Sequence, residues 1–155
     1  DISMIFQEPM TSLNPVVKVG KQVMEAIILH EKISKEEAKM RVIEIFNEVG
    51  IPEAEKRFNS YPHELSGGLR QRVMIGMAMI CKPKLLIADE PTGNLDPDTS
   101  MEIMDILERI NEQGTTIVMA THNSQIVNEK KHRVLAIESG QIVRDQEQGE
   151  YGYED

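Results

Sequence analysis

The apolar residues of this chain follow two spacings that alternate along it. Short runs in which almost every residue is apolar predict strands at 2–6, 85–88 and 115–120. Stretches with apolar residues three or four positions apart predict helices, and these fall at 16–30, 34–49, 66–81, 96–113 and 124–130. Strands that alternate with helices favour an α/β fold with a parallel sheet.

Polar and turn residues mark where these helices begin and end. Ser34, followed by Glu37, has the spacing of a capping box and predicts a helix start. Ser66 and Asp96 stand at two further predicted N-caps, and Pro97 suits the first turn after Asp96. Gly50 is a typical stop after a helix.

The predicted elements divide the single domain into parts. Residues 16–64 form a mostly helical insert between the first strand and the rest of the sheet. A helix follows at 65–81, and core strands and helices at 82–145. This last part includes a hairpin of 133–137 and 141–144 about Ser139-Gly140, and the acidic tail at 146–155 is expected to be loose.

Charge and composition exclude several functions. The net charge is −9, with the acidic excess after residue 80, so the chain repels nucleic acid phosphates and we expect no nucleic acid partner. Cys81 is the single cysteine and rules out a disulfide framework; its apolar surroundings predict a place in the core. The longest apolar run, 73–81, is too short to cross a bilayer, so we expect a cytosolic protein that meets a membrane only through a partner.

Two short stretches carry candidate chemistry. Ser66, Gly67 and Gly68 open a helix with bare backbone N–H groups, an arrangement that can bind a phosphate. Asp89 and Glu90 end an apolar strand, where Asp89 can bind Mg²⁺ and Glu90 can polarise a water molecule. Each stretch alone is better explained as an ordinary helix cap or strand-to-loop turn.

The order of the motifs argues against that explanation. Asn94-Leu95-Asp96 and Thr121-His122 follow the two stretches, and His122 stands at the carboxyl end of a strand, where α/β proteins bind ligands. With these residues the chain resembles the ATP-binding subunit of an ABC transporter along nearly its whole length. The resemblance implies a P-loop NTPase-like parallel sheet with a helical subdomain at 16–64.

The resemblance also implies roles for individual residues. It makes 65–68 the signature motif, with Ser66, Gly67 and Gly68 binding the nucleotide, and 85–90 the Walker B strand, with Asp89 on Mg²⁺ and Glu90 as general base. The remaining roles follow in chain order: Gln7 of the Q-loop contacts nucleotide and Mg²⁺, Asp96 of the D-loop lies at a dimer interface, and His122 contacts the γ-phosphate. Leu69 departs from the family pattern, which often has Gln there. ATP and Mg²⁺ are the implied cofactors, and a second ATPase subunit and a membrane permease are the implied partners.

The two halves of the chain resemble different branches of that family. Residues 1 to about 90, including Phe6-Gln7-Glu8-Pro9, look like the ATPases of dipeptide and oligopeptide importers. Residues from about 91 to 155, including Gly149-Glu150-Tyr151, look like the cell-division ABC ATPase. We hypothesise a natural or engineered chimera that changes branch within the shared Walker B segment.

The 155 residues contain no G-x-x-x-x-G-K-[ST] phosphate loop. We therefore expect the chain alone to bind ATP weakly and to hydrolyse it negligibly. We also expect its sheet, which lacks the phosphate-loop strand, to close up or to pair with another chain at an open edge. Two other functions are kept: a non-catalytic interaction or folding module, and a chromosome-maintenance ATPase, against which the charge and the lack of long heptad arms argue.

Overall fold

The computed structural model describes residues 1–8 and 12–152, in two compact units. The first unit spans residues 1–121 and the second begins at His122. Three residues of the predicted loop after the first strand, 9–11, and the last three of the tail, 153–155, lie outside the described residues. The described part of the chain has no helix that is both long and apolar enough to cross a membrane.

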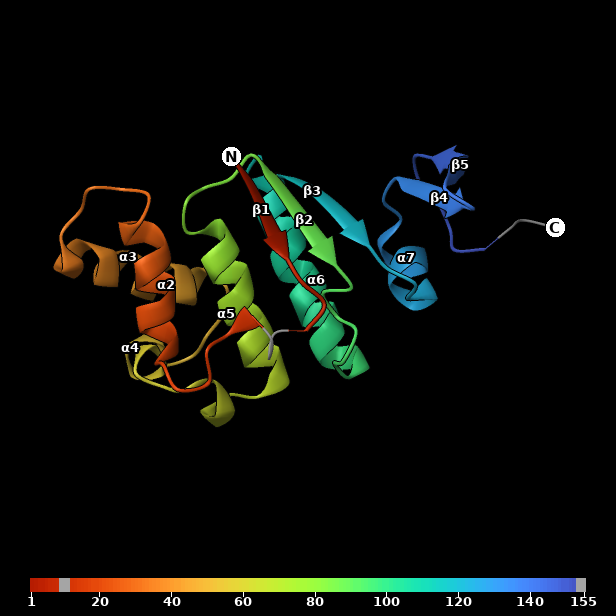
Figure 1. The fold of residues 1–155 in the computed structure, drawn as a ribbon. Coiled ribbons are helices and arrows are strands. Elements are labelled where there is room, and N and C mark those ends of the chain that lie inside the picture. The colour runs from red at the N-terminus through yellow and green to blue at the C-terminus, as the bar shows by residue number, and fades with distance from the viewer. Residues whose placement is uncertain (9–11, 153–155) are drawn as a thin grey trace. The chain divides into compact units, whose positions relative to one another are not determined.

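A parallel three-stranded sheet is the centre of the first unit (Figure 1). Its strands are β1 (Ile2–Ile5), β2 (Leu85–Asp89) and β3 (Thr116–Ala120), in that order. The register pairs Ile5 with Ala88 and Ala88 with Met119, so the carboxyl ends of the three strands lie at one edge of the sheet. The predicted strands and their parallel arrangement are confirmed.

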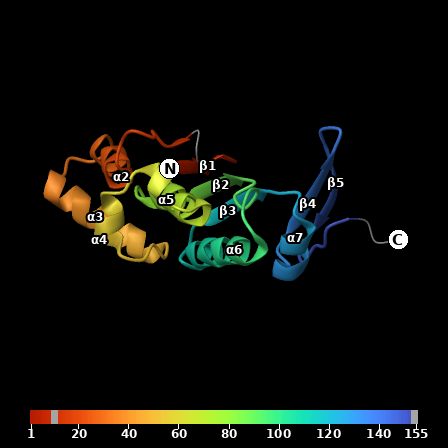
Figure 2. The same ribbon diagram turned by 90° about the horizontal axis from the view of Figure 1, so that it is seen from below.

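One face of this sheet is packed and the other is open. On the packed face Ile5, Leu86 and Ala88 are fully buried, and α5 (Gly67–Met79) contacts β1 while α6 (Pro97–Glu112) contacts β3. Figure 2 shows α6 along one side of the strands. On the other face the exposed fraction is 68% for Ile2 and 54% for Val118. This sheet therefore presents an apolar surface.

The helical insert is confirmed, with shifted boundaries. It contains α2 (Val19–Ile28), α3 (Lys35–Glu48), α4 (Ala54–Phe58) and the 3₁₀-helix η1 (Pro62–Glu64), the last two in a stretch for which the spacing of apolar residues predicted no helix. Val16 is highly exposed, so no packing extends α2 to the predicted start. Ser34 caps α3 as predicted, because its Oγ accepts a hydrogen bond from Glu37 N at 3.1 Å.

The predicted 66–81 helix also ends early. α5 stops at Met79 with Ile80 as its C-cap, so Cys81 follows the helix and is exposed. The prediction of a core cysteine was wrong for this reason. α6 follows its prediction closely: Asp96 is its N-cap, and Ile103, Ile106, Leu107 and Ile110 are buried along one side.

The second unit consists of α7 (Ser124–Lys130) and an antiparallel pair, β4 (Val134–Glu138) and β5 (Gln141–Gln146). Ser139 and Gly140 have φ of 49° and 78°, the left-handed values that a tight two-residue hairpin turn requires. Among the described residues β4 pairs with β5 and β3 pairs with β2, so the expectation that the sheet closes up was wrong. β3 pairs with no second strand of the described residues, so its other edge is free there. The alternative, pairing with another chain at that edge, stays a prediction.

The described part of the tail is less loose than expected. β5 extends to Gln146, and Gly149 N donates to His132 O at 3.1 Å. Tyr151 N donates to Asn128 Oδ1 at 2.7 Å, which attaches the tail to the end of α7. These hydrogen bonds order a segment whose composition alone indicated a solvated end.

Two helical glycines give a matched test of this packing. A Cβ at Gly20 of α2 would lie 2.3 Å from the Phe58 ring and 2.6 Å from its backbone oxygen, whereas at Gly76 of α5 it would lie 3.7 Å from Ile45. Gly20→Ala should lower the free energy of unfolding by about 1–3 kcal/mol through overpacking. Gly76→Ala should raise it by up to about 1 kcal/mol through helix propensity. Urea denaturation checks both, and equal effects would contradict the packing of α2 on α4.

Candidate functional site

The two predicted acids, Asp89 and Glu90, lie at the edge of the sheet where the strands have their carboxyl ends. Asp89 is the last residue of β2 and Glu90 follows it, while Gln7 follows β1 and Thr121 follows β3. Parallel α/β sheets bind ligands at this edge because the connecting loops diverge there. Asp89 and Glu90 are half-buried, so their carboxylates are accessible to a ligand.

Glu90 is held by the neighbouring strand and by its own turn. Its φ is 45°, in the left-handed region that a glutamate rarely adopts. Glu90 N donates to Ala120 O at 2.8 Å, and Thr121 Oγ1 donates to Glu90 Oε2 at 3.3 Å. Contacts from β3 thus hold both the backbone and the carboxylate, and strained backbone of this kind gathers at functional sites.

Gln7 and Glu90 meet around a glycine. Gly93 N donates to Glu90 O at 3.1 Å, which closes the turn after β2. A Cβ at Gly93 would lie 3.4 Å from Glu90 O and 4.0 Å from Gln7 Nε2. Both distances are ordinary van der Waals contacts, so the Gln7 amide lies beside the turn that carries Glu90. The predicted Q-loop and Walker B residues are adjacent in the fold.

The chemistry of these donors fits a bound Mg²⁺. Mg²⁺ prefers oxygen ligands, and in nucleotide sites it takes one or two carboxylates and completes its shell with phosphate and water. Asp89, Glu90 and the Gln7 amide supply ligands of this kind at one sheet edge. No group of three or more acidic, histidine or cysteine side chains that could hold a metal alone occurs within 1–8 and 12–152.

The signature residues open α5 as the sequence predicts. Ser66 is its N-cap, and Ser66 Oγ accepts a hydrogen bond from Leu69 N at 3.3 Å. Ser66 and Gly67 are exposed and Gly68 is half-buried, so the backbone N–H groups of the first turn can reach a ligand. A phosphate at this tip stays a prediction.

The two glycines also have a packing role. A Cβ at Gly68 would lie 2.6 Å from Thr99 Cγ2, whereas one at Gly67 would lie 3.4 Å from Leu95 Cδ2. Gly68 thus lets the start of α5 approach the start of α6 closely. The signature motif and the D-loop are in contact within one copy of the chain.

Asp96 fixes the other side of this contact. Its Oδ2 accepts a hydrogen bond from Thr99 N at 3.0 Å and its Oδ1 accepts one from Thr99 Oγ1 at 2.6 Å. The Thr99 hydroxyl is the main reason that the pKa of Asp96 is lowered. Our sequence reasoning identified Asp96 as a helix cap and did not identify Thr99. Its position three residues after the cap was the available signal.

His122 is exposed and is the first residue of the second unit, with which it is described. The structure therefore brings together Gln7 and Glu90 at the sheet edge, and Gly67 and Gly68 with the Asp96 turn at the two helix tips. The role of His122 stays a prediction.

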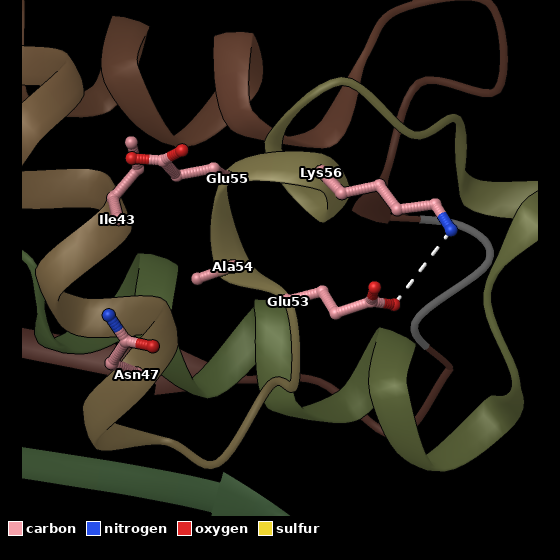
Figure 3. Close-up of a pocket in the computed structure, with 6 residues that line it drawn as sticks. All are labelled: Ile43, Asn47, Glu53, Ala54, Glu55 and Lys56. Carbon is pink, nitrogen blue, oxygen red and sulfur yellow. Dashed lines mark ion pairs between the residues drawn. The ribbon is translucent and has the colours of Figure 1, made fainter.

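A hollow of about 410 Å³ lies elsewhere, in the helical insert (Figure 3). It is lined by Ile43, Asn47, Glu53, Ala54, Glu55 and Lys56. Glu53 and Lys56 form an exposed ion pair of 3.8 Å across its mouth, a pair of a kind that contributes little stability. The hollow contains none of the predicted site residues.

Comparison with known proteins shows which family the chain is similar to. The sequence model of ABC transporters matches residues 1–93. The chain is 62% identical over 117 residues to the cell division ATP-binding protein FtsE of Streptococcus pneumoniae, covering 76% of this chain and 50% of that protein. It is 51% identical over 144 residues to the oligopeptide transport ATP-binding protein OppD of Bacillus subtilis, covering 92% of this chain and 40% of that protein.

Solved structures agree with these relatives. The dimeric, post-hydrolysis structure of the ATP-binding cassette MJ0796, bound to ADP and Pi, matches 97% of this chain and 64% of that chain. Its TM-score is 0.80 and its sequence identity 29%. The chain spans at most half the length of the two curated relatives above.

The comparisons bear on the two predicted branches. Both branches appear among the relatives, as the sequence analysis expected. Each match is too long to stop at residue 90, so both relatives align with residues on either side of the proposed change of branch. A chimeric origin stays a hypothesis.

Alanine substitutions separate the packing role of Gly68 from any role in phosphate binding. Gly68→Ala should lower the free energy of unfolding by about 1–3 kcal/mol because its methyl group meets Thr99. Gly67→Ala, which has more room, is the control and should change it little. Adding Thr99→Ser to Gly68→Ala removes the methyl partner and should restore most of the loss. Urea denaturation of the three variants decides, and no rescue would disprove the contact.

Removing the Thr99 hydroxyl should raise the pKa of Asp96. The folded pKa is lowered, so the cap stabilises the fold above the unfolded pKa and is lost as the pH falls through the folded value. Thr99→Val should move the pKa of Asp96 toward the ordinary aspartate value, as followed by NMR titration. Asp145, whose pKa is lowered by Arg133, is an internal control that should not move. An unchanged Asp96 would argue against the hydrogen bond.

Proposed function

Because the chain belongs to the ABC transporter family, we propose that it is an ATP-binding and ATP-hydrolysing module that couples nucleotide to the work of membrane partners. Its relatives include both peptide-import and cell-division ATPases. The observation that carries the proposal is the position of Glu90, held at the carboxyl end of β2 by Ala120 and Thr121. A general base must be fixed in this way to act on one water molecule.

The residues divide the reaction between them. Glu90 accepts a proton from the attacking water as that water approaches the γ-phosphate, and Thr121 orients the carboxylate. Asp89 and Gln7 would hold Mg²⁺, which when bound neutralises charge on the phosphates. His122 contacts the γ-phosphate at the next strand end.

The signature tip acts on a nucleotide held mainly by the phosphate loop of a second ATPase subunit. Ser66, Gly67 and Gly68 present backbone N–H groups to its γ-phosphate, and Asp96 lies at the interface between copies. The dimeric structures of the cassette MJ0796 support an association of two such subunits. The contact of Gly68 with Thr99 links both groups within each copy.

The 155 residues supply this closing half of the site without a phosphate loop. A general base accelerates hydrolysis by about 10²–10⁴-fold once the phosphoryl group is positioned. The chain by itself therefore binds ATP weakly and is inactive, and it becomes active when a phosphate loop is supplied.

The partners follow from the family. The chain binds a second ATPase subunit and permease subunits, and the helical insert at 16–64 is the part that meets the permease. Through these permease subunits the chain lies in the cytoplasm, peripheral to the inner face of the cell membrane. Its net charge of −9 opposes any nucleic acid partner.

One observation favours a second function. The open sheet face, with Ile2, Met4 and Val118 exposed, and the free edge of β3 suit a non-catalytic module that associates with another chain. In that case Asp89 and Glu90 would not take part in ATP hydrolysis. An assay of ATP hydrolysis separates the two functions.

The assay compares the chain alone with a complete cassette, made by joining it to the phosphate-loop half of an FtsE-type relative. Glu90→Gln should lower the turnover of the cassette by about 10²–10⁴-fold with ATP binding kept. Glu112→Gln, an exposed acid at the end of α6, is the control and should leave turnover unchanged. The chain alone should show no Glu90-dependent hydrolysis. A cassette that binds ATP but gains nothing from Glu90 would favour the non-catalytic module.

A further inference from the structure

Two arginines join the helical insert to the signature helix at opposite ends of one helix pair. Helix α3 belongs to the insert and α5 carries the signature motif at its start. The two helices contact each other, and a Cβ at Gly76 of α5 would be in ordinary contact with Ile45 and Val49 near the end of α3. The joint between insert and core therefore includes a small residue flanked by apolar ones.

The first arginine reaches from α3 to the end of α5. Arg41 Nη2 donates to the backbone oxygen of Ile80, the C-cap of α5, at 3.0 Å. Arg41 Nη1 donates at 2.5 Å to Glu31 Oε2, which orients the guanidinium. A cation at a helix C-terminus is favoured by the unpaired carbonyls and by the helix dipole.

The second arginine makes the reciprocal contact from α5 to the end of α3. Gly50, with φ of 78°, ends α3 in a Schellman motif: Gly50 N donates to Asn47 O and Ile51 N donates to Phe46 O. Arg72 Nη1 donates to Gly50 O at 2.7 Å. Arg72 Nη2 donates to Glu102 Oε2 on α6 at 2.5 Å. Arg72 therefore joins its own helix, α5, to the end of α3 and to α6.

We propose that Arg41 and Arg72 act together as positioning residues that fix the helical insert on the signature helix. Each arginine lies on one helix and binds a backbone carbonyl at the C-terminal end of the other. We call this pair the two-armed clasp. Arg72, near the middle of α5, reaches the end of α3, and Arg41, near the middle of α3, reaches the end of α5. The two contacts therefore lie in opposite order along the two helices. Each arm closes the joint at one end. Loss of either arm loosens the whole helix pair.

The clasp also extends to the catalytic half of the fold. Arg72 joins the insert to α6 through Glu102, one helical turn from the contact of Gly68 with Thr99. When the insert moves, the signature tip and the Asp96 turn therefore move with it. This consequence for ATP hydrolysis rests on the proposed function, whereas the clasp itself is a property of the first unit.

Arginine is required at both positions because each guanidinium binds two acceptors at once. A lysine has a single ammonium group and cannot match the planar fork that reaches a carbonyl and a carboxylate. The side chain of Arg72 is 16% exposed, and its Nε is buried without a hydrogen-bond partner. A shorter polar side chain there would leave Gly50 O without this donor.

Cys81 supplies a reporter at the Arg41 end. It is the single cysteine and follows Ile80 directly. Partial burial is the main reason that the pKa of its thiol is raised; Glu31 raises it further and Arg41 lowers it. If the joint opens, burial is lost, the pKa falls and alkylation accelerates.

The experiment uses the isolated chain. Each arginine is replaced in turn, and the effect is measured at the end of the helix pair that the other arginine contacts. Arg72→Gln should accelerate alkylation of Cys81 by iodoacetamide about five- to thirtyfold, the factor that corresponds to a loss of one or two kcal/mol. Arg41→Gln should accelerate hydrogen exchange at the Gly50 and Ile51 amides by a similar factor. Arg72→Lys, a milder change that keeps the charge, should give an intermediate alkylation rate.

Arg70→Gln is the matched control, because Arg70 lies on the same helix and its guanidinium Nε donates to Pro62 O of η1 rather than to the C-terminal end of α3. It removes the same charge and should leave the Cys81 rate unchanged. Effects confined to the end that was mutated would overturn the clasp, and so would equal effects of Arg70→Gln and Arg72→Gln. A third outcome separates the two proposals. If each arginine variant acts at the opposite end as expected but a completed cassette does not hydrolyse ATP, only the proposed function is rejected.

Discussion

The register of the parallel sheet is the constraint on which the site depends. Because β1, β2 and β3 run in the same direction and pair residue by residue, Gln7, Glu90 and Thr121 leave the sheet at one edge. The hydrogen bonds of Glu90 with Ala120 and Thr121 exist only in that register. A shift of one residue would exchange the buried and exposed faces of a strand and turn the Ile5 side chain away from the core.

A second set of contacts sets the position of the signature tip. Gly68 allows α5 to approach Thr99, which the carboxylate of Asp96 holds in place, and Arg72 ties the same helix to α3 and α6. Apart from the bond of Asp96 with Thr99, these contacts link residues far apart in the sequence, and they join the insert, the signature helix and the D-loop. The signature motif is thus also a packing motif, which explains why its glycine pattern alone indicates so little.

Much of this could be predicted from the sequence because its signals are local. Asp96 and Ser34 cap their helices as helix-start chemistry requires, and Ser139-Gly140 makes the expected hairpin turn. The long-range contacts could not be predicted. Nothing near Arg72 indicates Gly50 as its partner, and the exposed Cys81 depends on where α5 stops. The free edge of β3 depends on which strands pair, which the spacing of apolar residues does not determine.

The most direct test of the account is a crystal structure of the completed cassette carrying Glu90→Gln, with ATP and Mg²⁺ bound. The account predicts a dimer in which each γ-phosphate lies against Ser66, Gly67 and Gly68 of one copy and beside Asp89 and residue 90 of the other. A structure in which the start of α5 stays away from every bound nucleotide would contradict it.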